Sequence, residues 1–435
     1  MSVSRQINTS DISVLRYPVL PAARKMILFG DIFVSQSDAV SGNSTQAKGG
    51  SSFATWVNIL TQYRFNRLPS PSSVTGPYNF GLNGDTTTNL LARMASPLAA
   101  APDIVMLVIG GNDIAAGTLA APIVANLQSI VQQFNAIGAV VLWATIIPRL
   151  AANVFSSTQI SNALAVNQAM RRWAQTQRGF FLVDMDPVML DLTASTWVIP
   201  ASYLTDNVHP TQLGGTIYSQ AIANVLNQLY PNWRVGQKSG SDSYDATNNI
   251  SGNLLPNGFM LGTSGTVTVA TGTAANSTTV DATSAGGATV VASKGTLLDG
   301  SPAQVVVVSG STTGNAKVIT ITQSFTSLSN VAANDVLEAE VSYEVGANTN
   351  ISGVNTLLAS TESSTAYFHE ACVVAGTDNY QTAGFSSTLR LVTPQRVVTA
   401  QPSQAYLQTK IFLTNGSVSP TGTFKFGAMS VRKIF

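Results

Sequence analysis

Residues 104–113 read IVMLVIGGND, a run of six apolar residues followed at once by two glycines, an asparagine and an aspartate. A short, wholly apolar run is typical of a strand that is buried on both faces of a sheet. Apolar residues then recur at steps of three and four over 123–134, which predicts a helix with one apolar face. Strand, turn and helix in this order predict a parallel sheet, because parallel strands need long crossovers that are usually helical.

The same unit recurs on both sides of this stretch. Further buried strands are predicted from apolar runs at 26–29, 139–147 and 180–185. Further helices are predicted from apolar spacing at 56–63, 160–173 and 213–229. We therefore expect an α/β fold, a three-layer doubly wound parallel sheet with helices on both faces. Ligands of such sheets bind at the carboxyl ends of the strands, so the informative residues should follow the apolar runs.

The second half of the chain has a different pattern. From about residue 252, short alternating segments rich in Thr, Val, Ser and Gly are separated by turn residues, which predicts an antiparallel β-sandwich. Its predicted strands are 266–270, 289–292, 304–308, 317–323, 336–341 and 409–413. The predicted organisation is an N-terminal extension at 1–25, an α/β domain at 26–235, a polar linker at 236–252 and the sandwich at 253–435.

Composition excludes several classes of function. Only 10% of the 435 residues are charged and the formal net charge is +1, so a nucleic acid is not an expected partner. No apolar run reaches the roughly 18 residues of a membrane span, and the first ten residues lack the apolar region of a signal peptide. The lone Cys372 excludes an intrachain disulfide and a Cys-based zinc site. With only two histidines, we expect no metal and no cofactor.

Four polar blocks stand after predicted strands, in a turn, or before the last predicted helix. They are Gly30-Asp31-Ile32, NFGLNGDT at 79–86, GGND at 110–113 and DNVHP at 206–210. In this order the chain resembles the SGNH, or GDSL-type, hydrolase family, whose blocks read GDS, GxxGDT, GxND and DxxH. The resemblance covers about half the chain, from residue 26 to residue 229. Each block alone is a weak signal, and four in order are a specific one.

The resemblance implies a serine-esterase site. His209 matches the base that takes the proton of the nucleophile, and Asp206 matches the carboxylate that fixes the histidine tautomer. Gly84 and Asn112 match the oxyanion-hole donors. The nucleophile position, however, holds Ile32, which has neither a lone pair nor a proton to give. Loss of the nucleophile in a serine triad costs about a million-fold in turnover, so the chain as written is expected to be inactive or impaired.

The sequence is compatible with three explanations for Ile32. It is a recent or engineered change from serine in an intact site, or it marks a pseudoenzyme that binds an acylated sugar without cleaving it. The third is a substitute nucleophile, such as Ser35 or a water activated by His209. Ser35 would lie about 4.5 Å further along a helix axis, beyond the roughly 3 Å reach of proton transfer.

Two aspartates complete the predicted site as substrate-binding residues. Asp31 matches the family aspartate that organises the turn, and Asp113 could bind a substrate hydroxyl, with a loop-capping role as its alternative. In the sandwich, 253–259 and 424–431 resemble the first and last strands of jelly-roll carbohydrate-binding modules. Exposed aromatic rings would stack on sugars; the candidates, each also a core candidate, are Tyr343, Tyr367, Phe368, Tyr380 and Tyr406. His369 is expected to be structural.

Two functions follow as hypotheses. The first is a carboxylic ester hydrolase that removes acyl groups, most plausibly O-acetyl groups, from an acylated polysaccharide. The alternative is a non-catalytic carbohydrate-recognition protein, such as a bacteriophage tail or receptor-binding component, which by analogy alone would be a trimer. Either would act outside the cell or on a virion. The sequence does not identify the sugar, the acyl group or the oligomeric state.

Overall fold

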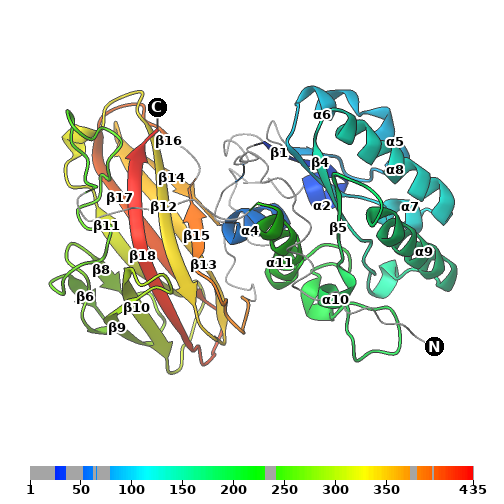
Figure 1. Ribbon diagram of the computed structural model, residues 1–435. Helices are drawn as coiled ribbons and strands as arrows, with labels where there is room; N and C mark the ends of the chain where they lie inside the picture. The colour runs from blue at the N-terminus through cyan, green and yellow to red at the C-terminus, as the bar shows by residue number, and fades with distance from the viewer. Residues whose placement is uncertain are drawn as a thin grey trace.

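The computed structural model describes residues 25–35, 52–61, 65, 79–230, 242–372, 380–393 and 396–434. The chain forms an α/β domain and a β-sandwich, drawn at opposite sides of Figure 1. Apart from Lys25, the predicted N-terminal extension lies outside the described residues, as does 236–241 of the predicted linker. The predicted domain boundaries therefore stay predictions.

The first sheet has five parallel strands in the order β2-β1-β3-β4-β5. These are β1 (Met26–Gly30), β2 (Asn79–Gly81), β3 (Ile104–Val108), β4 (Val140–Ala144) and β5 (Phe180–Val183). The four predicted strands are confirmed, although β4 and β5 are shorter than their apolar runs. The short strand β2 lies where the sequence predicted only a turn.

Helices cover both faces of this sheet, as predicted. They are α2 (Ile32–Ser35), α4 (Phe53–Leu60), α5 (Thr87–Ala92), α6 (Ala95–Ala99), α7 (Gly111–Ala115), α8 (Ala120–Ala136), α9 (Ser157–Ala174), α10 (Asp186–Met189) and α11 (Gln212–Leu229). On one face, Leu28 and Met106 share a buried cluster with residues of α4, α10 and α11. On the other, Phe29 and Leu107 share a cluster with residues of α5, α8 and α9. Alternate residues of each strand thus enter opposite cores, which explains the unbroken apolar runs.

The second half is a sandwich of two mostly antiparallel sheets. One has the order β15-β12-β18-β10-β9-β7 with β16 also paired to β12, and the other has the order β14-β13-β17-β11-β8-β6. The strands are β6 (Thr266–Thr268), β7 (Thr271–Gly272), β8 (Thr279–Asp281), β9 (Thr289–Thr296), β10 (Pro302–Ser309), β11 (Val318–Ser324), β12 (Val336–Val345), β13 (Ile351–Glu362), β14 (Thr365–Glu370), β15 (Leu389–Val392), β16 (Arg396–Val397), β17 (Pro402–Leu413) and β18 (Gly422–Lys433). The predicted sandwich is confirmed.

One predicted strand is wrong. Residues 253–259 form an isolated bridge and turns, whereas the predicted last strand is β18. The side chain of Asn253 explains the difference: its Nδ2 donates to the Met429 carbonyl at 2.9 Å, and its Oδ1 accepts from Val431 N at 2.9 Å and from Leu255 N at 3.1 Å. The asparagine amide thus takes the place of further backbone ladder bonds beside β18.

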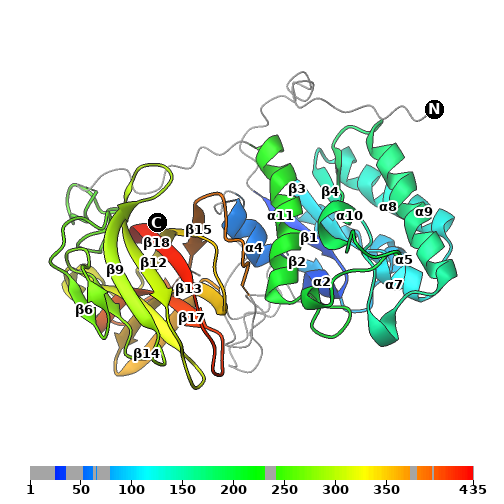
Figure 2. The ribbon, with the colours of Figure 1, turned by 90° about the horizontal axis from the view of Figure 1, so that it is seen from below.

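Helices α4 and α11 lie between the parallel sheet and the sandwich in both views (Figures 1 and 2). Trp56 of α4 belongs to the buried core of the sandwich, where its ring stacks on Phe385 with centroids 5.8 Å apart and contacts Tyr380 at 5.8 Å. The Gln212 amide, at the start of α11, donates to the carbonyl of Ser352 in β13. The two domains therefore share one buried interface.

Candidate active site

The predicted site residues all follow strands of the parallel sheet or precede α11. Asp31 and Ile32 follow β1, Gly84 lies in the turn after β2, and Asn112 lies in α7, two residues beyond Gly110. Asp206 and His209 lie in the loop before α11. Because β1 is paired to both β2 and β3 in parallel, the carboxyl ends of these three strands meet at one edge of the sheet.

His209 and Asp206 form a hydrogen-bonded pair. The Nδ1 atom of His209 lies 2.6 Å from Oδ2 of Asp206, and Oδ1 of Asp206 accepts from the His209 backbone N–H at 2.8 Å. Burial opposes ionisation of Asp206, but these bonds from His209 hold its pKa below the usual range. The Nε2 atom of His209 is buried and has no hydrogen-bond partner among the described residues. The bond to Asp206 thus fixes the orientation of the His209 ring, and its Nε2 atom can still accept a proton.

Ile32 is half-buried at the first position of α2. Its neighbour Phe33 packs against the His209 ring, with centroids 6.1 Å apart. Ser35, considered above as a substitute nucleophile, donates its hydroxyl to the Ile32 carbonyl and to Oδ1 of Asn83. The Ser35 hydroxyl is therefore hydrogen-bonded to the turn that follows β2.

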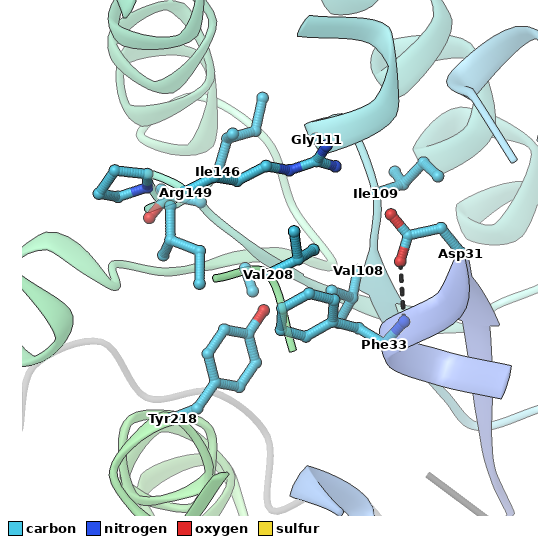
Figure 3. Close-up of a pocket in the computed structure, with 13 residues that line it drawn as sticks. Asp31, Phe33, Val108, Ile109, Gly111, Ile146, Arg149, Val208 and Tyr218 are labelled. Carbon is cyan, nitrogen blue, oxygen red and sulfur yellow. Dashed lines mark hydrogen bonds between the residues drawn. The ribbon is translucent and has the colours of Figure 1, made fainter. Parts of the chain in front are cut away.

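Asp31 is almost fully buried, with 5% of its surface exposed. Its Oδ1 accepts from the Phe33 backbone N–H at 3.1 Å. Burial raises the pKa of Asp31 to about 7, against the opposing effects of that N–H and of Arg149. This carboxyl lines a pocket together with the Tyr218 hydroxyl, as Figure 3 shows.

The two predicted oxyanion donors, Gly84 and Asn112, both adjoin Asp85. Gly84 has φ +80° in an open turn, a conformation that L side chains rarely adopt. The next residue, Asp85, accepts a 3.0 Å bond from Nδ2 of Asn112 through its backbone carbonyl. Oδ1 of Asn112 accepts from Nη2 of Arg149 at 2.9 Å. The Asn112 amide is thereby oriented, and one of its two N–H groups remains for a ligand.

Asp113 is buried and is not among the residues that line the pocket. It is 1% exposed, and its carboxylate accepts from both the backbone N–H and the hydroxyl of Thr87, the latter at 2.7 Å. Burial raises its pKa, although the bonds from Thr87 oppose this. The geometry favours the loop-capping alternative, in which Asp113 fixes the start of α5.

Sequence reasoning missed three side chains that line the pocket: Phe33, Arg149 and Tyr218. The pocket encloses about 440 Å³ of space not filled by atoms, its open mouth included. Figure 3 shows the Arg149 guanidinium and the Tyr218 ring reaching into it from different elements. Arg149 follows β4 closely, so the rule that ligands bind at the carboxyl ends of strands could have identified it.

Comparison with protein-family models matches residues 40–217 to the GDSL-like Lipase/Acylhydrolase family. Residues 40–217 belong to this family. The matched range of the GDSL-like domain includes Gly84, Asn112, Asp206 and His209, and it begins after Ile32. This part of the chain is thus of acylhydrolase lineage, and the match does not extend to the nucleophile position.

Solved structures similar to the GDSL-like domain include a catalytic mutant of an acetylxylan esterase from Geobacillus stearothermophilus, at 17% identity and a TM-score of 0.37, covering 50% of this chain and 99% of that one. A GDSL-like lipase from Bacteroides thetaiotaomicron matches at 16% identity and a TM-score of 0.36, covering 50% and 95%. No curated protein matches the chain in sequence.

The described residues contain no group of three or more His, Cys, Asp or Glu side chains that could hold a metal ion. Among the helices in the described ranges, none is long and apolar enough to cross a membrane.

Proposed function

We propose that the chain is a carbohydrate-directed acyl esterase by lineage, in which Ile32 occupies the nucleophile position and lowers turnover. The observation that carries the proposal is the His209–Asp206 pair, in which Nδ1 is bound at 2.6 Å and the buried Nε2 has no hydrogen-bond partner in the described ranges. In an acyl-transfer site this nitrogen would take the nucleophile's proton and return it to the leaving alcohol.

The substrate in this proposal is a sugar ester, most plausibly an O-acetyl group on a polysaccharide. The Asn112 amide and the Gly84 turn would bind the developing oxyanion, a contribution of about 3 to 4 kcal/mol for one donor by mutation. Binding and oxyanion donors alone leave about 1,000-fold catalysis over water when the nucleophile is missing. The sandwich would hold the polymer near the pocket, and Phe368, 61% exposed on edge strand β14, is the exposed ring that supports this part.

The decisive experiment compares hydrolysis of an uncharged acetyl ester and of acetylated polysaccharides by three proteins: the chain as written, Ile32→Ser, and Ile32→Ser with His209→Ala. We expect Ile32→Ser to raise turnover by several orders of magnitude, up to about a million-fold, and His209→Ala to abolish that gain. If Ile32→Ser stays inactive on every ester while remaining folded, the esterase proposal is wrong.

Ile32 itself favours a second candidate, a non-catalytic carbohydrate-recognition protein of the kind found in phage tails. In that case the chain would bind acylated polysaccharide and release no acid, and a trimer on a virion would be the expected assembly. Light scattering distinguishes a stable trimer from the monomer or dimer expected of a free extracellular esterase.

A further inference from the structure

Arg149 is a partly buried cation that forms no close ion pair with a carboxylate in the described part of the chain, although it interacts electrostatically with Asp31. Its Nη2 donates to Oδ1 of Asn112 at 2.9 Å, and its guanidinium lies 5.3 Å from the centroid of the Phe155 ring. No other hydrogen bond joins its N–H groups to the described residues. The other described arginines that are not exposed each pair with a carboxylate: Arg93, Arg171, Arg390, Arg396 and Arg432.

The pocket around this guanidinium is largely apolar. Most of its lining comes from aliphatic and aromatic side chains, namely Phe33, Val108, Ile109, Ile146, Ile147 and Val208. Removing a cation from water costs free energy, and burial lowers the pKa of Arg149, although the charge of Asp31 partly opposes this. A planar anion in the pocket would offset that cost by accepting two parallel N–H bonds from the guanidinium.

We propose that Arg149 binds the carboxylate of an acidic sugar, so that the preferred substrate is an acylated polysaccharide containing hexuronate or a similar residue. This inference rests on the proposed function and names its substrate class. Because Arg149 also contacts the Asn112 amide, the carboxylate would lie beside the ester carbonyl. A carboxylate is favoured over a phosphate because one guanidinium can balance its single charge through two parallel N–H bonds, whereas a dianion would keep an unbalanced charge in the pocket.

Asp31 lines the same pocket and interacts electrostatically with Arg149, Asp85 and Asp113, so its charge would affect the binding of an anion. Its ionised form would repel a second carboxylate, whereas its protonated form would not. Since burial raises the pKa of Asp31 to about 7, the carboxyl is largely protonated at pH 6, while the guanidinium stays charged. Hexuronate affinity should therefore be higher at pH 6 than at pH 8.

The test follows ligand binding without requiring turnover. The chain contains only two histidines, so the imidazole NMR signals of His209, beside the pocket residue Val208, can be assigned by substitution and monitored. D-Galacturonate and D-glucuronate are titrated against D-galactose, D-glucose, acetate and inorganic phosphate at fixed pH and ionic strength. The proteins are the chain as written, Arg149→Gln, Arg149→Lys and the control Arg178→Gln, which removes an exposed arginine.

We expect hexuronates to bind at least about tenfold more tightly than neutral hexoses, a difference of about 1.4 kcal/mol. Arg149→Gln should remove that preference, Arg149→Lys should keep part of it, and Arg178→Gln should leave it unchanged. Thermal unfolding checks that each variant is folded. The proposal is overturned if hexuronates do not shift the His209 signals, if acetate or phosphate binds as tightly, or if Arg149→Gln weakens charged and neutral sugars equally. That last result would mean that Arg149 only orients Asn112. Hydrolysis of an uncharged acetyl ester by Ile32→Ser is independent of these outcomes, so either proposal can fail alone.

Discussion

The two histidines of the chain lie in opposite environments. In the GDSL-like domain, His209 has its Nδ1 bound to Asp206 at 2.6 Å. On edge strand β14 of the sandwich, His369 has a buried Nδ1 without a partner among the described residues, and burial together with Arg396 lowers its pKa to about 4. Both rings are partly buried, yet among the described residues only His209 has a carboxylate bonded to its Nδ1, whereas the charge of Glu362 near His369 is outweighed by burial and Arg396. The comparison shows that the partner of Nδ1, more than burial, distinguishes a candidate base from a structural histidine.

The largest expected effect separates these two histidines directly. In the Ile32→Ser background, Asp206→Asn should lower kcat for an acetyl ester by about 10,000-fold, because the amide no longer stabilises the imidazolium or fixes its tautomer. His369→Ala, the matched control, should change kcat by less than twofold. Steady-state kinetics of the three proteins provide the measurement. Equal losses in both variants would remove the distinction between the two sites.

Trp56 tests whether the two regions are energetically separate. Its ring comes from α4 of the GDSL-like domain and is 1% exposed in the core of the sandwich. Trp56→Ala should lower the free energy of unfolding by about 3 to 5 kcal/mol, as for other large core residues. Leu192→Ala, at a side chain 76% exposed, should change it by less than about 0.5 kcal/mol. Chemical denaturation measures both, and a similarly small loss for Trp56→Ala would contradict a shared core.

Asp31 makes the stability of the protein depend on pH. Its folded pKa, about 7, lies above the ordinary value of 3.8, so the folded state holds a proton that the unfolded state loses between these pH values. This group therefore makes stability fall as pH rises from about 4 to 7, by up to about 4 kcal/mol. Asp31→Asn should be near neutral at pH 4 and stabilising by about 2 to 4 kcal/mol at pH 8. Urea unfolding at both values checks this, and a difference that does not grow with pH would show that Asp31 is not buried as a neutral acid.

The sequence predicted those parts of the molecule that depend on residues close together in the chain. Strands such as β3 are buried on both faces, so their apolar runs are unbroken, and Asp206 and His209 lie three residues apart in one loop. Strand β13 was missed because Gly353 and Asn355 interrupt its alternation, although its residues are nearly all buried. The pairing of Arg149 with Asn112 joins residues 37 positions apart. Such contacts depend on the sheet order, which local patterns do not encode.

The aromatic residues of the sandwich show the same limit and supply the smallest predicted effect. Tyr343 and Tyr380 are core residues, with their hydroxyls 3.3 Å apart, whereas Phe368 is 61% exposed opposite Ala359 on β13. Phe368→Ala should change the free energy of unfolding by less than about 0.5 kcal/mol. If the ring stacks on sugar, the same variant should weaken binding of an acetylated polysaccharide by about two- to tenfold.

Val397→Ala, which truncates a side chain 54% exposed on the other sheet, is the matched control and should alter neither quantity. Affinity electrophoresis in gels containing the polysaccharide measures binding, and urea unfolding measures stability. Equal affinity for Phe368→Ala and Val397→Ala would contradict sugar binding at the β14 edge. Because the Phe368 ring contributes little to the core, a loss of affinity at unchanged stability would identify it as a contact to the ligand.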